Sequence, residues 1–193
     1  MINYLGTPKI ETERLILRRM ELSDAQMAFD HWLSDERVSD NRVSAAHKTV
    51  SETIERITKI VEDYTKEDFC WWGIDQKANG KLIGEIDLYD FDNATGNCEV
   101  SYSIGYEWWN NGYATEALMA VMEYGFRHMQ IHKIAAAHNT DNMASGKVML
   151  KAGMVREGVI RHMVRNAKNQ YKDCAIYGII QEDYFKMNCT IIN

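Results

Sequence analysis

The sequence has no apolar run of the length that a membrane span requires, and it has no excess of basic residues. Its formal net charge is −6 at pH 7, whereas proteins that bind nucleic acids in general are normally basic. The N-terminal residues 1–13 lack the basic-then-apolar layout of a signal peptide. We therefore expect a cytoplasmic protein that contacts neither membranes nor nucleic acids directly.

Cysteine and proline are also scarce. The four cysteines form neither a Cys-x-x-Cys pair nor a metal-ligand spacing, so we expect free thiols and no metal site. They are Cys70, Cys98, Cys174 and Cys189. The chain has one proline, Pro8, and contains no internal repeat, low-complexity tract or linker. Its 193 residues therefore predict one domain, residues 1–193, with a continuous hydrophobic core.

Apolar residues recur at two kinds of spacing along the chain. Alternation with polar residues predicts strands, and recurrence every three or four residues predicts helices. The predicted strands cover residues 12–20, 69–75, 81–89, 97–106, 133–138, 154–164 and 170–181. The predicted helices follow Ser23 or Asp24, begin at Ser51, and cover residues 116–128 and 142–151. This order of strands and helices predicts a mixed α/β sheet.

The stretch 109–117 joins a predicted strand to an amphipathic helix. Such a strand, glycine-bearing loop and helix directs backbone N–H groups and the helix dipole toward one point, which favours phosphate. Gly112 permits close approach of an anion, and Thr115 is suited to cap the helix and offer a hydroxyl group. The stretch has no Gly-Lys-Ser/Thr and no G-x-G-x-x-G spacing, which excludes both common nucleotide-binding loops.

The pattern Trp109-x-x-Gly112-x-Ala114 resembles the pyrophosphate loop of the GNAT superfamily of acyl-CoA-dependent N-acetyltransferases, Arg/Gln-x-x-Gly-x-Gly/Ala. Trp109 departs from that consensus but agrees with the ribosomal-protein N-acetyltransferase branch, whose loop reads Trp-Gly-x-Gly-Tyr-Ala-Thr-Glu-Ala. The opening Glu-Thr-Glu-Arg-Leu-Ile-Leu-Arg and the later Asn142-x-x-Ser145 also resemble this branch. The resemblance covers essentially the whole chain.

The resemblance implies a mostly antiparallel central sheet of about seven strands, splayed at its two central strands and flanked by about four helices. It implies transfer of an acetyl group from acetyl-CoA to a primary amine by direct attack in a ternary complex. The expected acceptor is a protein N-terminal α-amine. A small amine such as a polyamine, amino acid or antibiotic is the alternative, as is a catalytically silent acyl-CoA-binding domain. A homodimer is a further expectation at the level of the family.

The same resemblance implies the residues that hold acetyl-CoA. The strand ending at Ile104, Gly105 and Tyr106 is expected to pair with the pantetheine arm, with the N–H near Ile104 polarising the thioester carbonyl and Gly105 permitting a bulge. Backbone N–H groups of the loop are expected to bind the pyrophosphate, and Asn142 the pantetheine. The loop residues are Asn111, Gly112, Tyr113, Ala114 and Thr115.

Two residues are expected to carry the proton transfers. Glu99 begins the strand before the loop and is the first choice as a base acting through water; Glu85, Asp87 and His138 are its rivals. Many superfamily members place a tyrosine acid seven residues after the asparagine. Here Met149 occupies that position, so Ser145 is the candidate to hydrogen-bond the leaving thiolate, with a plain surface helix as the alternative. An α-amine, with a pKa of about 7.7–8.0, needs only a weak base.

Overall fold

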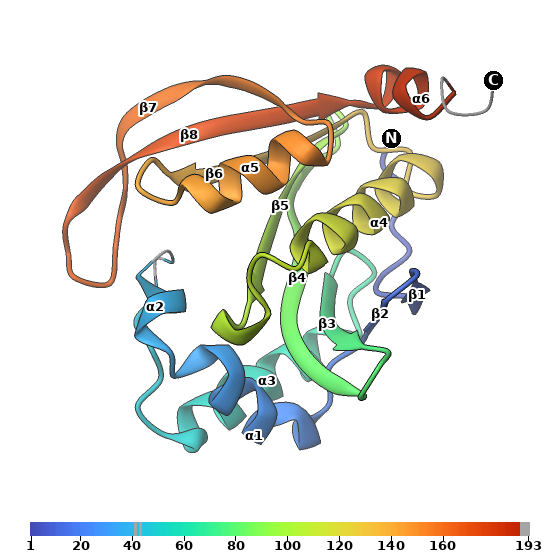
Figure 1. Cartoon of the computed structure of the whole chain (residues 1–193). Helices are drawn as coiled ribbons and strands as arrows, with labels where there is room; N and C mark the ends of the chain where they lie inside the picture. Colours follow the sequence, from blue (N-terminus) through green and yellow to red (C-terminus); the bar gives the residue numbers. More distant parts are fainter. Residues whose placement is uncertain (41, 43, 190–193) are drawn as a thin grey trace.

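The computed structural model describes residues 1–40, 42 and 44–189, with side chains up to residue 187 (Figure 1). The strands are β1 (Ile10–Glu11), β2 (Leu15–Arg18), β3 (Cys70–Gln76), β4 (Lys81–Asp92), β5 (Asn97–Ile104), β6 (Lys133–Asn139), β7 (Val155–Arg165) and β8 (Tyr171–Ile180). The helices are α1 (Ala25–Ala28), α2 (Glu36–Ser39), α3 (Val50–Asp63), α4 (Tyr113–Arg127), α5 (Met143–Lys151) and α6 (Gln181–Cys189).

The strands form one sheet in the order β1-β2-β3-β4-β5-β6-β8-β7. Every neighbouring pair is antiparallel except β5 and β6, which run parallel and pair only from Asn97–Lys133 to Glu99–Ala135. Beyond these three residue pairs the two central strands diverge. The predicted mixed sheet and its central splay are confirmed, and the two-residue β1 brings the described sheet to eight strands instead of about seven.

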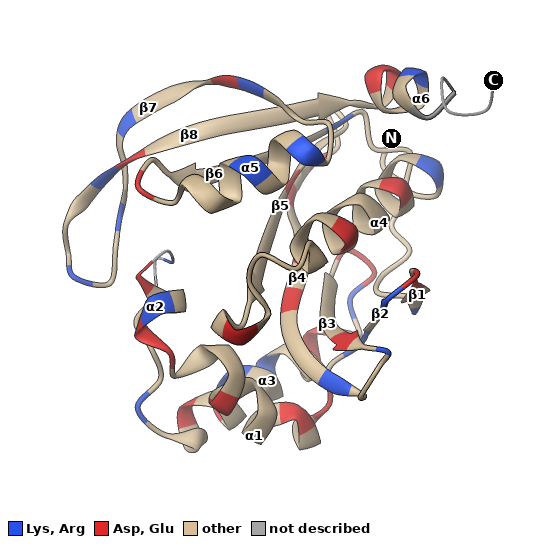
Figure 2. Ribbon diagram, in the orientation of Figure 1, with Lys and Arg blue, Asp and Glu red and all other residues tan. Residues whose placement is uncertain are grey.

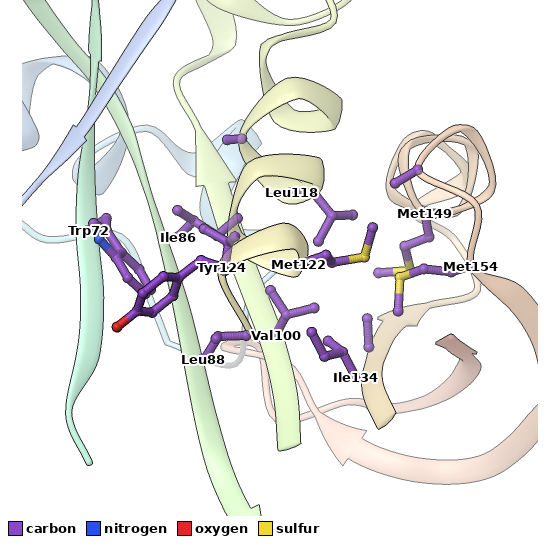
Figure 3. Packing of buried hydrophobic residues seen from close by; sticks show 14 of the residues in the cluster. Trp72, Ile86, Leu88, Val100, Leu118, Met122, Tyr124, Ile134, Met149 and Met154 are labelled. Atoms are coloured by element: carbon purple, nitrogen blue, oxygen red, sulfur yellow. The ribbon is translucent and has the colours of Figure 1, made fainter. Parts of the chain in front are cut away.

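Apolar residues on alternate positions of the strands pack against helices on both faces. Trp72, Ile86 and Val100 of the sheet meet Leu118 and Met122 of α4 in the larger cluster, together with residues of α5 (Figure 3). The opposite face carries a second cluster, to which α1, α3 and the turn of residues 29–33 contribute Ala28, Ile57 and Trp32. The sheet is therefore the middle of three layers.

Three helical elements differ from the sequence-based prediction, the first being α2, which lies in a stretch where no regular helix was predicted. The helix expected after Ser23 or Asp24 is a short α1 followed by a π-helical turn, Phe29–Leu33. The last strand ends at Ile180, and the chain continues as α6, which the alternation pattern did not predict. The long β7–β8 hairpin reaches past α5 toward α2, where Lys168 pairs with Asp40 at 2.7 Å (Figure 1).

The described cysteines are Cys70, Cys98 and Cys174, and all three are free and buried, as expected. The side chain of Cys189 lies outside the described residues. None of the helices within the described ranges combines the length and apolar character needed to cross a membrane.

Candidate active site

A cavity of about 740 Å³ lies where β5 and β6 diverge. Side chains from both faces of β5 line it, including Ser101 and Ser103 on one face and Tyr102 and Ile104 on the other. The cavity therefore passes through the sheet and opens a path between its two faces. The predicted site residues that line it are Ile104, Gly112, Tyr113, Ala114, Thr115, Asn142, Ser145, Glu85 and His138. Glu99, Asp87, Gly105, Tyr106 and Asn111 are not among its lining residues.

The loop at one end of the cavity is shaped by two left-handed residues. Asn110 has φ +61° and Gly112 has φ +81°, and the chain turns there so that α4 begins at Tyr113. Gly112, and not Thr115 as expected, is therefore the N-terminal cap, and its carbonyl accepts from the N–H of Glu116 at 3.0 Å. Thr115 belongs to the first turn, whose N–H groups have no partner within the helix. Without a Cβ at position 112, these donors stay open to an anion.

The strand before the loop presents its backbone to the gap. The N–H of Gly105 donates to the carbonyl of Ile83 in β4 at 2.9 Å. Because backbone groups of an antiparallel strand alternate in direction, the N–H of Ile104 points away from β4, toward the diverging β6. The carbonyl of Ile104 accepts from the indole N–H of Trp109 at 2.7 Å. The N–H of Ile104 is thus directed into the gap between β5 and β6, and its role as an oxyanion donor stays a prediction.

Gly105 is small for a reason other than the expected bulge. A Cβ there would lie 2.5 Å from the carbonyl oxygen of His31 and 2.9 Å from the ring of Trp108. The pairing of β4 with β5 is regular up to Ile104, and its one irregularity lies at the other end, between Tyr89 and Asp92. Close approach of the residue 29–33 turn therefore demands glycine at position 105. The neighbouring Tyr106 is 45% exposed, and the Arg37 guanidinium lies 3.7 Å from its ring centre.

The start of α5 forms the wall across the gap from β5. Asn142 caps this helix, because its Oδ1 accepts from the N–H of Ser145 at 3.3 Å while its Nδ2 donates to Ser145 Oγ at 2.9 Å. The carbonyl of Ser145 accepts from the hydroxyl of Tyr102 at 3.1 Å, which ties α5 to β5. Ser145 Oγ accepts from Asn142, so its own proton is available to an acceptor in the cavity. Tyr102, which fixes this arrangement, was not identified from the sequence.

Glu85, Asp87 and Glu99 lie on the face of the sheet opposite to α4 and α5, and their environments differ. Burial alone would raise the pKa of Glu85, but Arg56 and Arg42 outweigh it and hold the pKa below the ordinary value. Arg56 binds Glu85 through two hydrogen bonds of 2.9 Å, and Arg42 approaches to 3.3 Å. A carboxylate held this firmly in its charged form is a poor proton acceptor. Neither arginine was foreseen as its partner.

Asp87 lies two residues further along β4 and is 4% exposed. Burial, reinforced by the negative charge of Glu85, raises its pKa to about 7, against the opposing hydrogen bond from Ser101. Ser101 Oγ donates to Asp87 Oδ1 and itself lines the cavity. Asp87 is therefore one hydroxyl group away from the cavity and titrates near neutral pH, which suits a general base.

Glu99 and His138 have other surroundings. Glu99 Oε2 accepts from the hydroxyl of Tyr89 at 2.7 Å on the same face as Asp87. His138 lines the cavity, and its Nδ1 lies 2.7 Å from the carbonyl oxygen of Asn139. Because a carbonyl only accepts, Nδ1 carries a proton and donates it to Asn139. The other ring nitrogen, Nε2, is buried beneath Gly146 and is therefore covered by α5.

Acetyl-CoA fits this arrangement. The positive φ of Gly112 leaves a cradle without a Cβ at the open N-terminus of α4, and the cavity connects this cradle with Ile104 and Ser145. The cavity lining thus runs from a phosphate-binding loop to polar groups inside the sheet.

Comparison with known proteins agrees with this geometry. A family model described as an acetyltransferase (GNAT) domain matches residues 14–155, more than half of the chain. The uncharacterized N-acetyltransferase YoaA of Bacillus subtilis is 32% identical over 174 residues, covering 90% of this chain and 97% of that protein. The ribosomal protein uS5-alanine N-acetyltransferase of Escherichia coli is 25% identical over 192 residues, covering 93% and 95% of the two chains.

A crystal structure of a GNAT-family acetyltransferase from Bacillus anthracis superimposes with a TM-score of 0.80 at 26% identity, covering 91% of this chain and 99% of that one. The structural match therefore covers most of the chain, and the resemblance to the GNAT superfamily is confirmed. The chain belongs to the GNAT family of acetyl-CoA-dependent N-acetyltransferases.

Proposed function

We propose that this enzyme acetylates the α-amine of protein N-termini, by direct attack of the amine on acetyl-CoA within a ternary complex. The observation that carries the proposal is Asp87, a buried carboxyl group with a pKa of about 7 that is hydrogen-bonded to the cavity-lining Ser101. Such a base can deprotonate an α-amine of pKa about 7.7–8.0, whereas a lysine at about 10.4 would demand a stronger one. The uS5-alanine relative supports the same acceptor class.

The transfer balances as follows. The thioester supplies an activated acetyl group; the amine nitrogen forms a bond to its carbonyl carbon, the carbon–sulfur bond breaks, and the sulfur leaves as the thiolate of coenzyme A. The second proton, which the nitrogen loses as the amide forms, goes to this thiolate and gives the free thiol. Asp87 accepts the proton that the ammonium group loses, through Ser101. The N–H of Ile104 stabilises the carbonyl oxygen as negative charge develops on it. The hydroxyl of Ser145 donates a hydrogen bond toward the departing sulfur.

Direct attack is also supported by the cysteines. None of the described ones, Cys70, Cys98 and Cys174, lines the cavity, so none is placed to carry an acetyl group. Burial raises the pKa of Cys70 to about 12, which keeps it as an unreactive thiol. Glu99 stays a candidate for the proton acceptor through water, and the variant Glu99→Gln separates it from Asp87. With an acceptor of the ribosomal-protein type, the proposed location of the enzyme is the cytoplasm.

A thiol-release assay with acetyl-CoA tests the proposal. The acceptor panel holds short peptides with free Ala, Ser or Met N-termini, the same peptides N-blocked but containing lysine, polyamines and aminoglycosides. Release with free N-termini alone is the expected result. Release with polyamines or aminoglycosides but not with peptides would contradict it and assign a small-molecule acceptor. Tight binding of acetyl-CoA without release for any amine would instead indicate a silent acyl-CoA-binding domain.

A further inference from the structure

The phosphate-binding loop and the stretches of sequence on either side of it lack positive charge, although Lys147 and Lys151 of α5 line the same cavity. Between Lys81 and Arg127 the sequence has no lysine or arginine, so β4 beyond its first residue, β5, the loop and α4 up to its last residue carry none (Figure 2). The first turn of α4 instead contains an acidic residue, Glu116. A pyrophosphate diester carries two negative charges, and an uncompensated carboxylate beside it would oppose binding. The compensating cation has to come from another part of the chain.

Arg14, in the segment between β1 and β2, reaches across to this loop. Its Nε donates to Glu116 Oε2 at 2.7 Å and its Nη1 donates to the carbonyl of Asn111 at 2.9 Å. The backbone N–H of Arg14 and the hydroxyl of Thr12 both donate to Glu116 Oε1. The guanidinium group also lies 4.7 Å from the ring centre of Tyr113. These contacts compensate the negative charge of Glu116 and hold the planar guanidinium group of Arg14 against the loop.

The remaining guanidinium nitrogen of Arg14, Nη2, points to Gly112. A Cβ built on Gly112 would lie 3.4 Å from Arg14 Nη2, and within the described part of the chain nothing accepts a hydrogen bond from this nitrogen. Arg14 lines a second hollow, which shares Gly112, Thr115 and Lys151 with the cavity in the sheet. The two hollows thus meet at the open N–H groups of α4, with Arg14 on the side away from the splayed strands.

The geometry points to Arg14 as a pyrophosphate-binding residue, which supplies from outside the loop the positive charge that the loop lacks. Nη2 donates to a pyrophosphate oxygen held by the N–H groups of α4. Nε compensates the charge of Glu116, and Nη1 holds the carbonyl of Asn111. This assignment rests on the use of acetyl-CoA in the proposed function, and on neither the acceptor nor the base.

Ligand affinity tests the assignment without any acceptor. Dissociation constants of CoA, dephospho-CoA and pantetheine are measured by titration of the wild type and of Arg14→Met. Dephospho-CoA keeps the pyrophosphate and lacks the 3′-phosphate, and pantetheine lacks both. We expect Arg14→Met to weaken binding of CoA and of dephospho-CoA alike, by about 10- to 100-fold, as for a lost charge-assisted hydrogen bond. Pantetheine affinity should change by less than about twofold.

Other combinations of the three affinities would contradict the assignment, each for a different reason. Equal weakening of all three ligands would overturn the assignment, because it would show a general distortion of the site. Weakening of CoA alone would overturn it in favour of contact with the 3′-phosphate. Unchanged affinity for CoA would overturn it outright. A wild type that binds none of the three would overturn the proposed function itself, whereas the preceding results leave that function standing.

Two further variants control the measurement. Arg127→Met removes a positive charge from the far end of α4, about 20 Å from the loop, and should leave all three affinities unchanged. Arg14→Lys keeps the charge but cannot reach Glu116 and Asn111 at once, so it should weaken CoA and dephospho-CoA by less than Arg14→Met does. Should Arg14→Met fail to fold, Arg14→Lys still tests the assignment. Pantetheine binding weakened as much as binding of CoA and dephospho-CoA would contradict it.

Discussion

Replacement of Asp87 by asparagine should make the protein more stable at alkaline pH and much less active. The carboxyl group is 4% exposed, and burial raises its pKa from 3.8 to about 7. Between pH ~4 and ~7 the folded state therefore holds a proton that the unfolded state has released, so stability falls as the pH rises through this window. At about 1.4 kcal/mol per pKa unit, the roughly three units amount to about 4 kcal/mol once the pH exceeds 7.

The assay compares unfolding free energies by urea titration at pH 5 and pH 8. The asparagine amide cannot ionise, so the fixed cost of its altered hydrogen bonding is the same at both values and cancels in the difference. About two of the three pKa units of the Asp87 shift lie between pH 5 and 7. From pH 5 to pH 8 the wild type should therefore lose about 3 kcal/mol of unfolding free energy that Asp87→Asn does not lose. In the same variant kcat/KM should fall about 10²- to 10⁴-fold, as expected for a lost general base.

Asp92→Asn is the matched control at the end of the same strand. Thr95 and the N–H of Ala94 hydrogen-bond the Asp92 carboxylate and lower its pKa, so its replacement should give no gain at pH 8. The wild-type pH profile of kcat/KM should also rise through about 7, and Asp87→Asn should lose that limb. Equal pH dependence of stability in wild type and Asp87→Asn, or full activity in the variant, would refute the role given to this residue.

Three other substitutions have expected outcomes. Arg56→Met leaves buried Glu85 without its bidentate partner and should cost about 3–5 kcal/mol of unfolding free energy in urea titrations; a loss below 1 kcal/mol would contradict the described pairing. Gly112→Ala should weaken CoA binding at least about tenfold in titrations, while Gly80→Ala, at φ +66° with open space around its Cβ, should lose stability alone. Ser145→Ala should lower kcat with little change in KM for acetyl-CoA; a change in KM alone would assign it to binding.

The parts of the site that depend on neighbouring residues could be predicted from the sequence. The loop at Gly112 and the cap at Asn142 each depend on residues within a few positions of one another, and the structure has both. The position of the cap on α4 was mistaken, because the left-handed turn at Asn110 starts the helix earlier than Thr115 suggests. Backbone conformation of this kind leaves only a weak trace in side-chain patterns.

The choice among the carboxylates could not be made from the sequence. Period-two alternation places Glu85, Asp87 and Glu99 on one face of the sheet, as observed, but says nothing about how deeply each is covered. That depends on contacts between distant segments, such as Arg56 of α3 with Glu85. Arg14 was missed for the same reason, because its partner Glu116 lies 102 residues away.

Mapping the acetyl group on a single peptide tests the central claim most directly. The peptide carries a free N-terminal alanine and an internal lysine, is incubated with enzyme and acetyl-CoA at pH 7.5, and is sequenced by tandem mass spectrometry. The account predicts acetylation of the N-terminal nitrogen, with the lysine unmodified, and loss of this product with Asp87→Asn. Acetylation of the lysine in preference to the N-terminus would contradict it.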